Sequence, residues 1–199
     1  MYIPKGNWSI QSELTIPGDH ITVIGSGRES VISANSFNGR HFAGTDTDFF
    51  TLKNITLIGD GINANENVGG IEITRFNKTN SEGHLFENVT IKDITSTGIY
   101  INTPILSTFK YCQVEVALYH GFYFKNGGTS VSMESCYAVT CQRAGYRFDT
   151  MTYCSLYGCA ADGNGIGYKF ENSKSVVLNG CGAEGSNNNS TWYDGYNYY

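Results

Sequence analysis

Apolar and polar residues alternate in five short segments that share the form Gly-apolar-x-apolar. These segments begin at Gly70, Gly98, Gly121, Gly145 and Gly167, so successive glycines lie 28, 23, 24 and 22 residues apart. Apolar residues at alternate positions predict a β-strand with one buried face. A strand that returns at such a regular interval predicts one structural unit stacked many times, as in a solenoid.

A second set of residues recurs at nearly the same interval as the Gly-apolar-x-apolar segments. Its members follow the five glycines by 18, 14, 15, 14 and 14 residues, and they are Asn88, Cys112, Cys136, Cys159 and Cys181. We expect them to form one inward column, begun by Asn54, in which thiols pack as small apolar groups and amides hydrogen-bond along the axis. Each period therefore holds at least two strands, joined by turns rich in Gly, Asn and Ser. The predicted fold is all-β: a single-stranded parallel β-helix of about eight rungs.

The composition agrees with this fold and limits the classes of partner that the protein could bind. The 199 residues include 24 glycines, with 14% aromatic but only 16% charged residues. The net charge of −5 and the lack of any Lys/Arg run argue against nucleic acid as a partner. No apolar run is long enough for membrane insertion, and the first residues lack the apolar core of a signal peptide. Neither cysteines nor histidines have metal-ligand spacing, so we expect no metal and no cofactor.

The opening of the chain resembles a known superfamily. The segment Ile3-Pro4-Lys5-Gly6-Asn7-Trp8-Ser9-Ile10, with Leu14-x-Ile16-Pro17 and Ile21-x-Val23-Ile24-Gly25-x-Gly27, is similar to the first coils of pectate-lyase-like right-handed β-helices. Within that superfamily it looks most like the rhamnogalacturonase/epimerase-type domains of bacteriophage tailspikes. The Gly-Tyr-x-Phe and Cys-x-Ala repeats between residues 121 and 184 are similar to rungs of such phage proteins. We expect a β-helix domain over 1–185, with 186–199 as a polar-aromatic tail or the start of a further rung or cap.

This resemblance implies a function as well as a fold. It implies a tailspike-like domain that binds a bacterial cell-surface polysaccharide, lies on a virion tail or outside the cell, and forms a homotrimer. An active member would be a glycoside hydrolase or a polysaccharide lyase. The sequence has no Asn-Thr-Asp or Gly-His-Gly signature of polygalacturonases and no Arg-x-Pro-x-x-Arg of classical pectate lyases. Two hypotheses follow: a domain that binds and depolymerises a polysaccharide, or a non-catalytic adhesin or structural virion component.

Alternation within the Gly-apolar-x-apolar strands also predicts an outward column. Its members lie between the two inward residues of each strand, and they are Glu72, Tyr100, Tyr123, Arg147 and Lys169. Tyrosines present flat apolar surfaces to sugar rings, and the two cations suit an acidic polysaccharide. Two long segments, 59–69 and 74–84, flank the first of these strands, and insertions in solenoids commonly border the binding face. The alternative is a plain solvated surface.

Two acidic residues on another face are candidates for catalysis. Asp162 and Glu184 each stand three residues after a cysteine of the column. Adjacent rungs would bring their backbones to about 5 Å, and two carboxyl groups at about that separation fit a retaining glycosidase. Acidic rung ends that serve solubility alone are the competing interpretation.

The long segments supply a second candidate set. Asp60 and Glu66 lie in the first segment and Glu82 and His84 in the second, with Glu72 between them. An acid pair from this set could hydrolyse a glycosidic bond. The same region could instead catalyse β-elimination, in which Arg75 neutralises a uronate while His84 or Tyr100 removes the α-proton.

Overall fold

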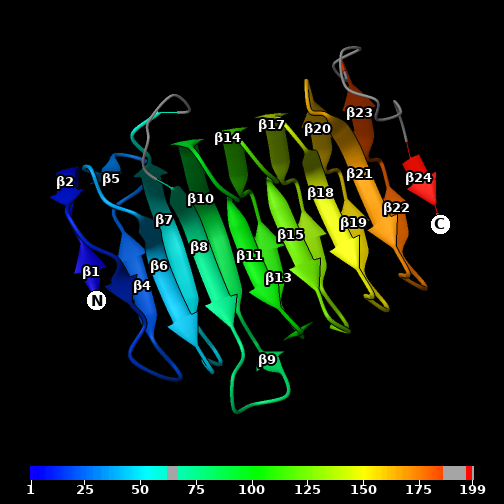
Figure 1. Ribbon diagram of the computed structural model, residues 1–199, viewed down its shortest axis with the longest axis horizontal. Coiled ribbons are helices and arrows are strands. Elements are labelled where there is room, and N and C mark those ends of the chain that lie inside the picture. The colour runs from blue at the N-terminus through cyan, green and yellow to red at the C-terminus, as the bar shows by residue number, and fades with distance from the viewer. Residues whose placement is uncertain (62–66, 186–195, 199) are drawn as a thin grey trace.

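The computed structural model describes residues 1–61, 67–185 and 196–198, which wind into a parallel β-helix (Figure 1). The chain advances from the N-terminus at one end of the solenoid to the last strand at the other. About seven turns are present, close to the eight rungs predicted, and the all-β class is confirmed. The described residues form no helix, and hence no apolar helix of the length needed to cross a membrane.

One face of the solenoid is an eight-stranded parallel sheet. It contains the apolar-x-apolar part of all five Gly-apolar-x-apolar segments, and its strands are stacked in chain order. They are β3 (Leu14–Thr15), β6 (Gly39–Thr45), β8 (Val68–Thr74), β11 (Ile99–Asn102), β15 (Phe122–Lys125), β18 (Ala144–Asp149), β21 (Ile166–Glu171) and β24 (Tyr196–Tyr198).

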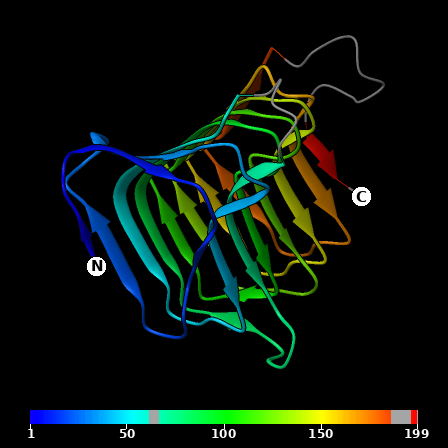
Figure 2. The ribbon, with the colours of Figure 1, turned by 60° about the vertical axis from the view of Figure 1, so that its left-hand side comes forward.

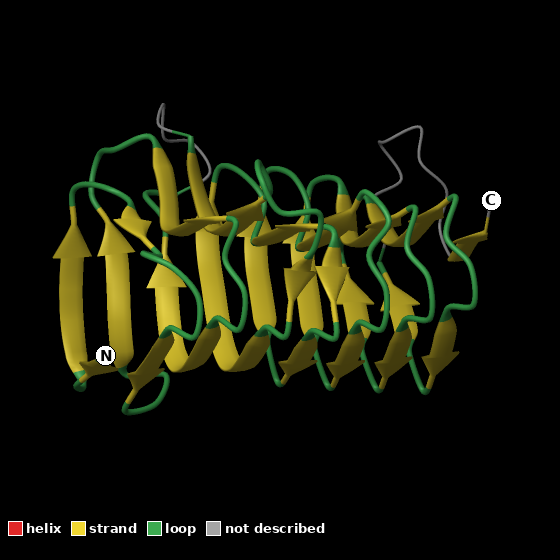
Figure 3. Cartoon of the chain, turned by 90° about the horizontal axis from the view of Figure 1, so that it is seen from below, coloured by secondary structure: helices red, strands yellow, loops and turns green. Residues whose placement is uncertain are grey.

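The rest of each turn belongs to a fourteen-stranded sheet that bends at a corner and encloses the interior (Figures 2 and 3). The long strand β10 pairs with β13 before the corner and with β14 after it. The strands are β1 (Tyr2–Ile3), β2 (Gly6–Ile10), β4 (Thr22–Gly25), β5 (Ser30–Ala34), β7 (Thr51–Ile58), β10 (Leu85–Ile94), β13 (Thr108–Lys110), β14 (Gln113–Ala117), β16 (Ser132–Glu134), β17 (Tyr137–Cys141), β19 (Ser155–Tyr157), β20 (Ala160–Asp162), β22 (Val177–Asn179) and β23 (Gly182–Glu184). A small third sheet pairs β9 (Ser81–Glu82) with β12 (Pro104–Ile105).

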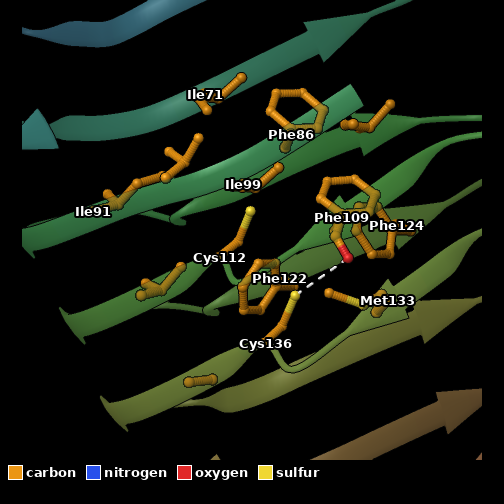
Figure 4. Packing of buried hydrophobic residues seen from close by; sticks show 14 of the residues in the cluster. Ile71, Phe86, Ile91, Ile99, Phe109, Cys112, Phe122, Phe124, Met133 and Cys136 are labelled. Atoms are coloured by element: carbon orange, nitrogen blue, oxygen red, sulfur yellow. Dashed lines mark hydrogen bonds between the residues drawn. The ribbon is translucent and has the colours of Figure 1, made fainter. Parts of the chain in front are cut away.

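The interior is filled by stacks of similar side chains, as alternation predicts. The inward residues of the Gly-apolar-x-apolar strands are buried, none more than 3% exposed: Ile71, Ile99, Phe122, Tyr146, Tyr168, Ile73, Ile101, Phe124, Phe148 and Phe170. The rings of Phe122, Tyr146 and Tyr168 stack in sequence, with centroids 5.0 and 4.8 Å apart. Figure 4 shows Ile71, Ile99 and Phe122 pointing into this core from successive strands. The buried Tyr168 hydroxyl donates to the Cys159 carbonyl at 2.6 Å, so its polar end is satisfied.

The glycines that open these strands are required by the closeness of the rungs. A Cβ atom on Gly98 would lie 2.6 Å from the Gly121 carbonyl oxygen, and one on Gly121 would lie 2.6 Å from that of Gly145. Real Cβ atoms do not approach backbone oxygen so closely. Only a residue without a side chain lets successive turns pack at the spacing of hydrogen-bonded strands.

The cysteine column is confirmed, but its first members differ from the prediction. Cys112, Cys136 and Cys159 are buried, and Cys136 Sγ donates to the Phe109 carbonyl at 3.6 Å (Figure 4). The strand register that pairs Thr90 with Gln113 places Val89, not Asn88, level with Cys112.

Asn54 and Asn88 instead occupy the corner position one residue earlier. Both have positive φ, as do Tyr111 and Ser135 at the same place in later turns. Asn tolerates the left-handed conformation better than most residues, which explains its use at this bend. The predicted amide ladder does form there, because Asn88 Nδ2 donates to Asn54 Oδ1 at 3.0 Å.

Candidate functional site

The five outward residues lie side by side on the eight-stranded sheet. Glu72 is paired with Tyr100, Tyr100 with Tyr123, Tyr123 with Arg147, and Arg147 with Lys169. All five are partly exposed. The predicted column geometry is therefore confirmed, and we call this set the Tyr–Arg column.

Aromatic and cationic groups contact one another within the column. The rings of Tyr100 and Tyr123 meet edge to face, with centroids 5.4 Å apart. The Arg147 guanidinium lies 4.5 Å from the Tyr123 ring centroid, and Lys125 Nζ lies 5.6 Å from that of Tyr100. Such cation–π contacts hold the two rings in place on the sheet. Burial raises the pKa of Tyr100 to about 12, so this hydroxyl keeps its proton at neutral pH and serves as a hydrogen-bond donor rather than a base.

A second line of residues runs beside the column and was missed by the sequence analysis. Ser96, Tyr119 and Arg143 stand two positions before successive glycines, so the same period could have revealed them. Backbone hydrogen bonds stack them: Arg143 N donates to Tyr119 O at 3.0 Å, and Tyr119 N to Ser96 O at 3.3 Å. The Arg143 guanidinium covers the Tyr119 ring at 4.4 Å.

Between these two lines the surface is hollowed into a groove of about 270 Å³. Three tyrosines and cations from several turns form its walls. The lining residues are Arg40, Glu72, Ser96, Thr97, Tyr100, Tyr119, His120, Tyr123, Lys125, Arg143 and Arg147.

The acidic groups at the two ends of the column are neutralised by neighbouring cations. Glu72 forms an ion pair with Arg40 Nε, contributed by the preceding strand β6. At the other end, Glu171 accepts from Arg147 at 2.7 Å and from Lys169 at 2.8 Å, and these cations lower the pKa of Glu171 against the opposing effect of burial. The walls of the groove are therefore aromatic and cationic.

His84 and Arg75 lie in the interior rather than on the Tyr–Arg column. The His84 side chain is 1% exposed, accepts from the Phe50 backbone N–H at Nδ1 and contacts Ser81 Oγ through Nε2 at 2.6 Å. Burial, helped by the Arg75 charge, lowers the pKa of His84 to about 4 and keeps the ring neutral. Arg75, whose side chain is 5% exposed, pairs with Asp48 at 2.7 Å. These contacts give both residues a place in packing one corner of the solenoid.

The candidate residues of the two long segments are divided between opposite ends of a strand pair. β7 and β10 are in register from Thr51 opposite Leu85 to Ile58 opposite Lys92. Asp60 follows the far end of β7, where its carboxylate accepts from Ser36 N at 2.6 Å. Glu82 and His84 precede the near end of β10. The structure therefore does not bring Asp60 together with them, and Glu66 lies outside the described residues.

The other acidic pair occupies adjacent turns of the fourteen-stranded sheet. Asp162 is paired in register with Glu184, as the spacing predicted, and Asp162 accepts from the Tyr137 hydroxyl at 3.1 Å. This sheet is not the one that carries the Tyr–Arg column. In residues 1–61 and 67–185, no three or more His, Cys, Asp or Glu side chains are grouped so that they could hold a metal ion.

Comparison with known proteins connects this geometry to a fold. No protein-family model matches the sequence, and no curated protein matches it. Among solved structures, the chain is similar to the N-terminal fragment of bacteriophage phi29 gene product 12, with a TM-score of 0.72, 14% identity and coverage of 92% of this chain and 36% of that one.

Two further structures show the same likeness. The gp42 tailspike of Acinetobacter phage vb_AbaP_AS12 has a TM-score of 0.67, with 11% identity over 95% of this chain and 41% of the tailspike. DFA-IIIase from Arthrobacter chlorophenolicus A6 has a TM-score of 0.73, with 10% identity over 89% of this chain and 51% of the enzyme. This chain thus spans between about a third and a half of the length of these proteins. It has the right-handed parallel β-helix fold that they share.

Proposed function

We propose that this chain is the β-helical part of a phage tailspike-like protein and that it binds a bacterial cell-surface polysaccharide along the Tyr–Arg column. The observation that carries the proposal is the groove in which Tyr100, Tyr119 and Tyr123 stand among stacked cations. Tyrosine combines a flat apolar ring with a hydroxyl, which suits the apolar faces and hydroxyl groups of sugars. The columns repeat along the solenoid axis, so successive sugars of an extended chain would meet successive turns.

The distribution of acidic groups favours binding without cleavage. Glu72, the carboxylate within the groove, is paired with Arg40. Glu171, at the other end of the column, is paired with Arg147 and Lys169. A general acid must hold a proton at neutral pH, whereas the cations beside Glu171 lower the pKa of that carboxyl group. The Asp162–Glu184 pair lies on the other sheet. Hydrolysis by this pair at a separate site is the alternative candidate function, because the two residues occupy adjacent turns.

The setting of the domain is part of the same proposal. The phage structures to which the chain is similar support a place on a virion tail. A homotrimer, as the family resemblance implies, would present three grooves to one cell surface and raise the avidity for a repetitive polysaccharide. Sedimentation of the purified protein would measure its oligomeric state.

Affinity electrophoresis through gels that contain capsular polysaccharide or lipopolysaccharide tests the proposed binding. We expect one preparation to retard the protein, and we expect Tyr123→Ala to weaken this binding about tenfold, because the stacking surface is removed. Tyr157→Ala is the matched control, since Tyr157 is an exposed tyrosine on the other sheet. Equal losses in the two variants, or no retardation by any preparation, would contradict the proposal.

The same preparations distinguish binding from cleavage. New reducing ends would indicate hydrolysis, and absorbance from unsaturated uronates would indicate elimination. If reducing ends appear and Asp162→Asn abolishes them while the Tyr123-dependent binding remains, the alternative function is established. Binding with no product supports the non-catalytic adhesin.

A further inference from the structure

A second hollow, of about 290 Å³, adjoins the groove at the C-terminal end of the Tyr–Arg column. It shares His120, Arg143 and Arg147 with the groove and adds Lys169, Ala144 and Ile166. Three of its six lining residues are cations, and they come from two successive turns: Arg147 on β18 is in register with Lys169 on β21.

The positive charge of this hollow is only partly neutralised. Glu171 is shared between Arg147 and Lys169, and it uses one carboxylate oxygen for each. Arg143 forms no ion pair with any residue in the described part of the chain, and its guanidinium is instead stacked on the Tyr119 ring. Within the described residues, Glu171 is the carboxylate that pairs with Arg147, and Arg143 adds a second guanidinium that forms no ion pair there, so the two arginines bring more positive charge to the hollow than this carboxylate neutralises.

His120 gives the second and independent observation. The backbone N–H of Ala144 donates to its Nδ1 at 3.1 Å, so the proton of the neutral ring must be on Nε2. Burial and the charges of Arg147, Arg143 and Lys169 lower the pKa of His120 to about 3, which keeps the ring neutral. Nε2 nevertheless faces Arg147 Nη1 at 3.2 Å, although a guanidinium can only donate. Two donors thus converge at one wall of the hollow, and neither accepts from the other.

We propose that this hollow is the subsite that binds the carboxylate of an acidic sugar, a uronic acid residue of the polysaccharide in the groove; this inference rests on the proposed function. One carboxylate oxygen would accept from His120 Nε2–H and Arg147 Nη1–H together, and the Arg143 guanidinium would pair with the negative charge. Charge-assisted bonds of this kind are among the stronger polar contacts in proteins. The aromatic groove would then hold neighbouring sugars by their rings.

Titration of the ¹⁵N-labelled full chain with D-glucuronate tests this subsite directly, with D-glucose as the uncharged probe. We expect a saturable shift of the Ala144 amide with glucuronate and none with glucose. Arg143→Gln and Arg147→Gln should each weaken glucuronate binding about tenfold or more. Lys110→Gln is the matched control, because it removes a cation from an ion pair on the other sheet. Thermal unfolding of each variant confirms that it is folded.

The outcomes separate this inference from the proposed function. No saturable shift, an equal response to glucose, or full binding by both arginine variants would overturn the carboxylate subsite. Inorganic sulfate binding as tightly as glucuronate would also overturn it, in favour of a general anion site. If glucuronate fails while Tyr123-dependent polysaccharide binding persists, only the subsite is lost. If glucuronate binds but no polysaccharide is retained, the proposed function fails and the subsite stands.

Discussion

Two outward columns of this solenoid arrange their charges in opposite ways. On the fourteen-stranded sheet, Lys53, Glu87, Lys110 and Glu134 follow one another in register, and we call this set the ladder column. Its charges alternate, with ion pairs of 2.8 Å between Lys53 and Glu87 and 3.2 Å between Lys110 and Glu134. Each charge is neutralised by the next turn, which is typical of a solvated face.

The Tyr–Arg column instead places like beside like. Tyr100 stacks on Tyr123, and Arg147 lies beside Lys169, with Glu171 as their shared anion. Because equivalent positions in a solenoid lie one strand spacing apart, repeated residue types build a continuous aromatic or cationic surface. Where positive and negative residues alternate along a column, their charges instead neutralise one another. The difference shows how the order of residue types within one column decides whether charges on a flat face are paired or lie side by side.

Acid should produce the largest effect, and it should act through the buried histidines of the interior rather than through the exposed ion pairs of the ladder column. His41, His84 and His120 are buried and neutral, with lowered pKa values, about 4 for His84 and about 3 for His120. Between pH 6.5 and these values the unfolded chain binds more protons than the folded one, so the free energy of unfolding falls as the pH falls. For His84 and His120, whose pKa values lie about two units or more below 6.5, each histidine contributes about 3 kcal/mol to this loss by pH 4.5.

Urea unfolding at pH 7 and pH 4.5 measures this loss. The variant His120→Gln should be less sensitive to acid than the unaltered protein, because one of the three titrating groups is gone. A free energy of unfolding that stays constant over this range would contradict the account of the buried histidines.

Substitution of a rung glycine should have the next largest effect and should disturb both columns together. Gly121→Ala would place a Cβ 2.6 Å from the Gly145 carbonyl oxygen, and we expect a loss of about 1–3 kcal/mol from the resulting displacement of the strands. Gly18→Ala is the control, because no atom lies within 4 Å of the added group. Denaturant unfolding of both variants would show the difference, and equal stability would refute the steric explanation.

The smallest effect is expected from the ladder column. Lys110→Gln removes one member of an ion pair whose side chains are 43% and 44% exposed. Exposed pairs gain little because water screens them. We expect the unfolding midpoint and the polysaccharide affinity to remain unchanged within error. A marked loss of binding would mean that this face, too, contacts the ligand, and the contrast between the columns would fail.

Much of the fold and part of the candidate site could be predicted because a solenoid repeats. Alternation in Gly121-Phe122-Tyr123-Phe124 predicted two buried rings with a partly exposed one between them. The same pattern of two buried residues around a partly exposed one was confirmed on the other four strands. The prediction failed where strands meet corners. Asn88 was aligned with Cys112, but a left-handed corner residue shifts the alignment by one position.

Residues outside the regular strands could not be placed from the pattern. His84 and Arg75 lie within the long segment 74–84, and the path of this segment turns both side chains inward. His120 was not among the predicted site residues. Its position immediately before a rung glycine is visible in the sequence, but its contacts with Ala144 and Arg147 depend on the next turn.

By itself, the sequence determined the period, the direction of each strand residue and therefore the make-up of every column, since a strand offers only two faces. The tertiary structure alone decided which columns form a groove, which charges are already paired and which polar groups are buried at the corners. Ion pairs such as Arg40–Glu72 join residues from different turns. Such contacts depend on side-chain reach and on the curvature of the corners, and neither property is encoded in the spacing of apolar residues.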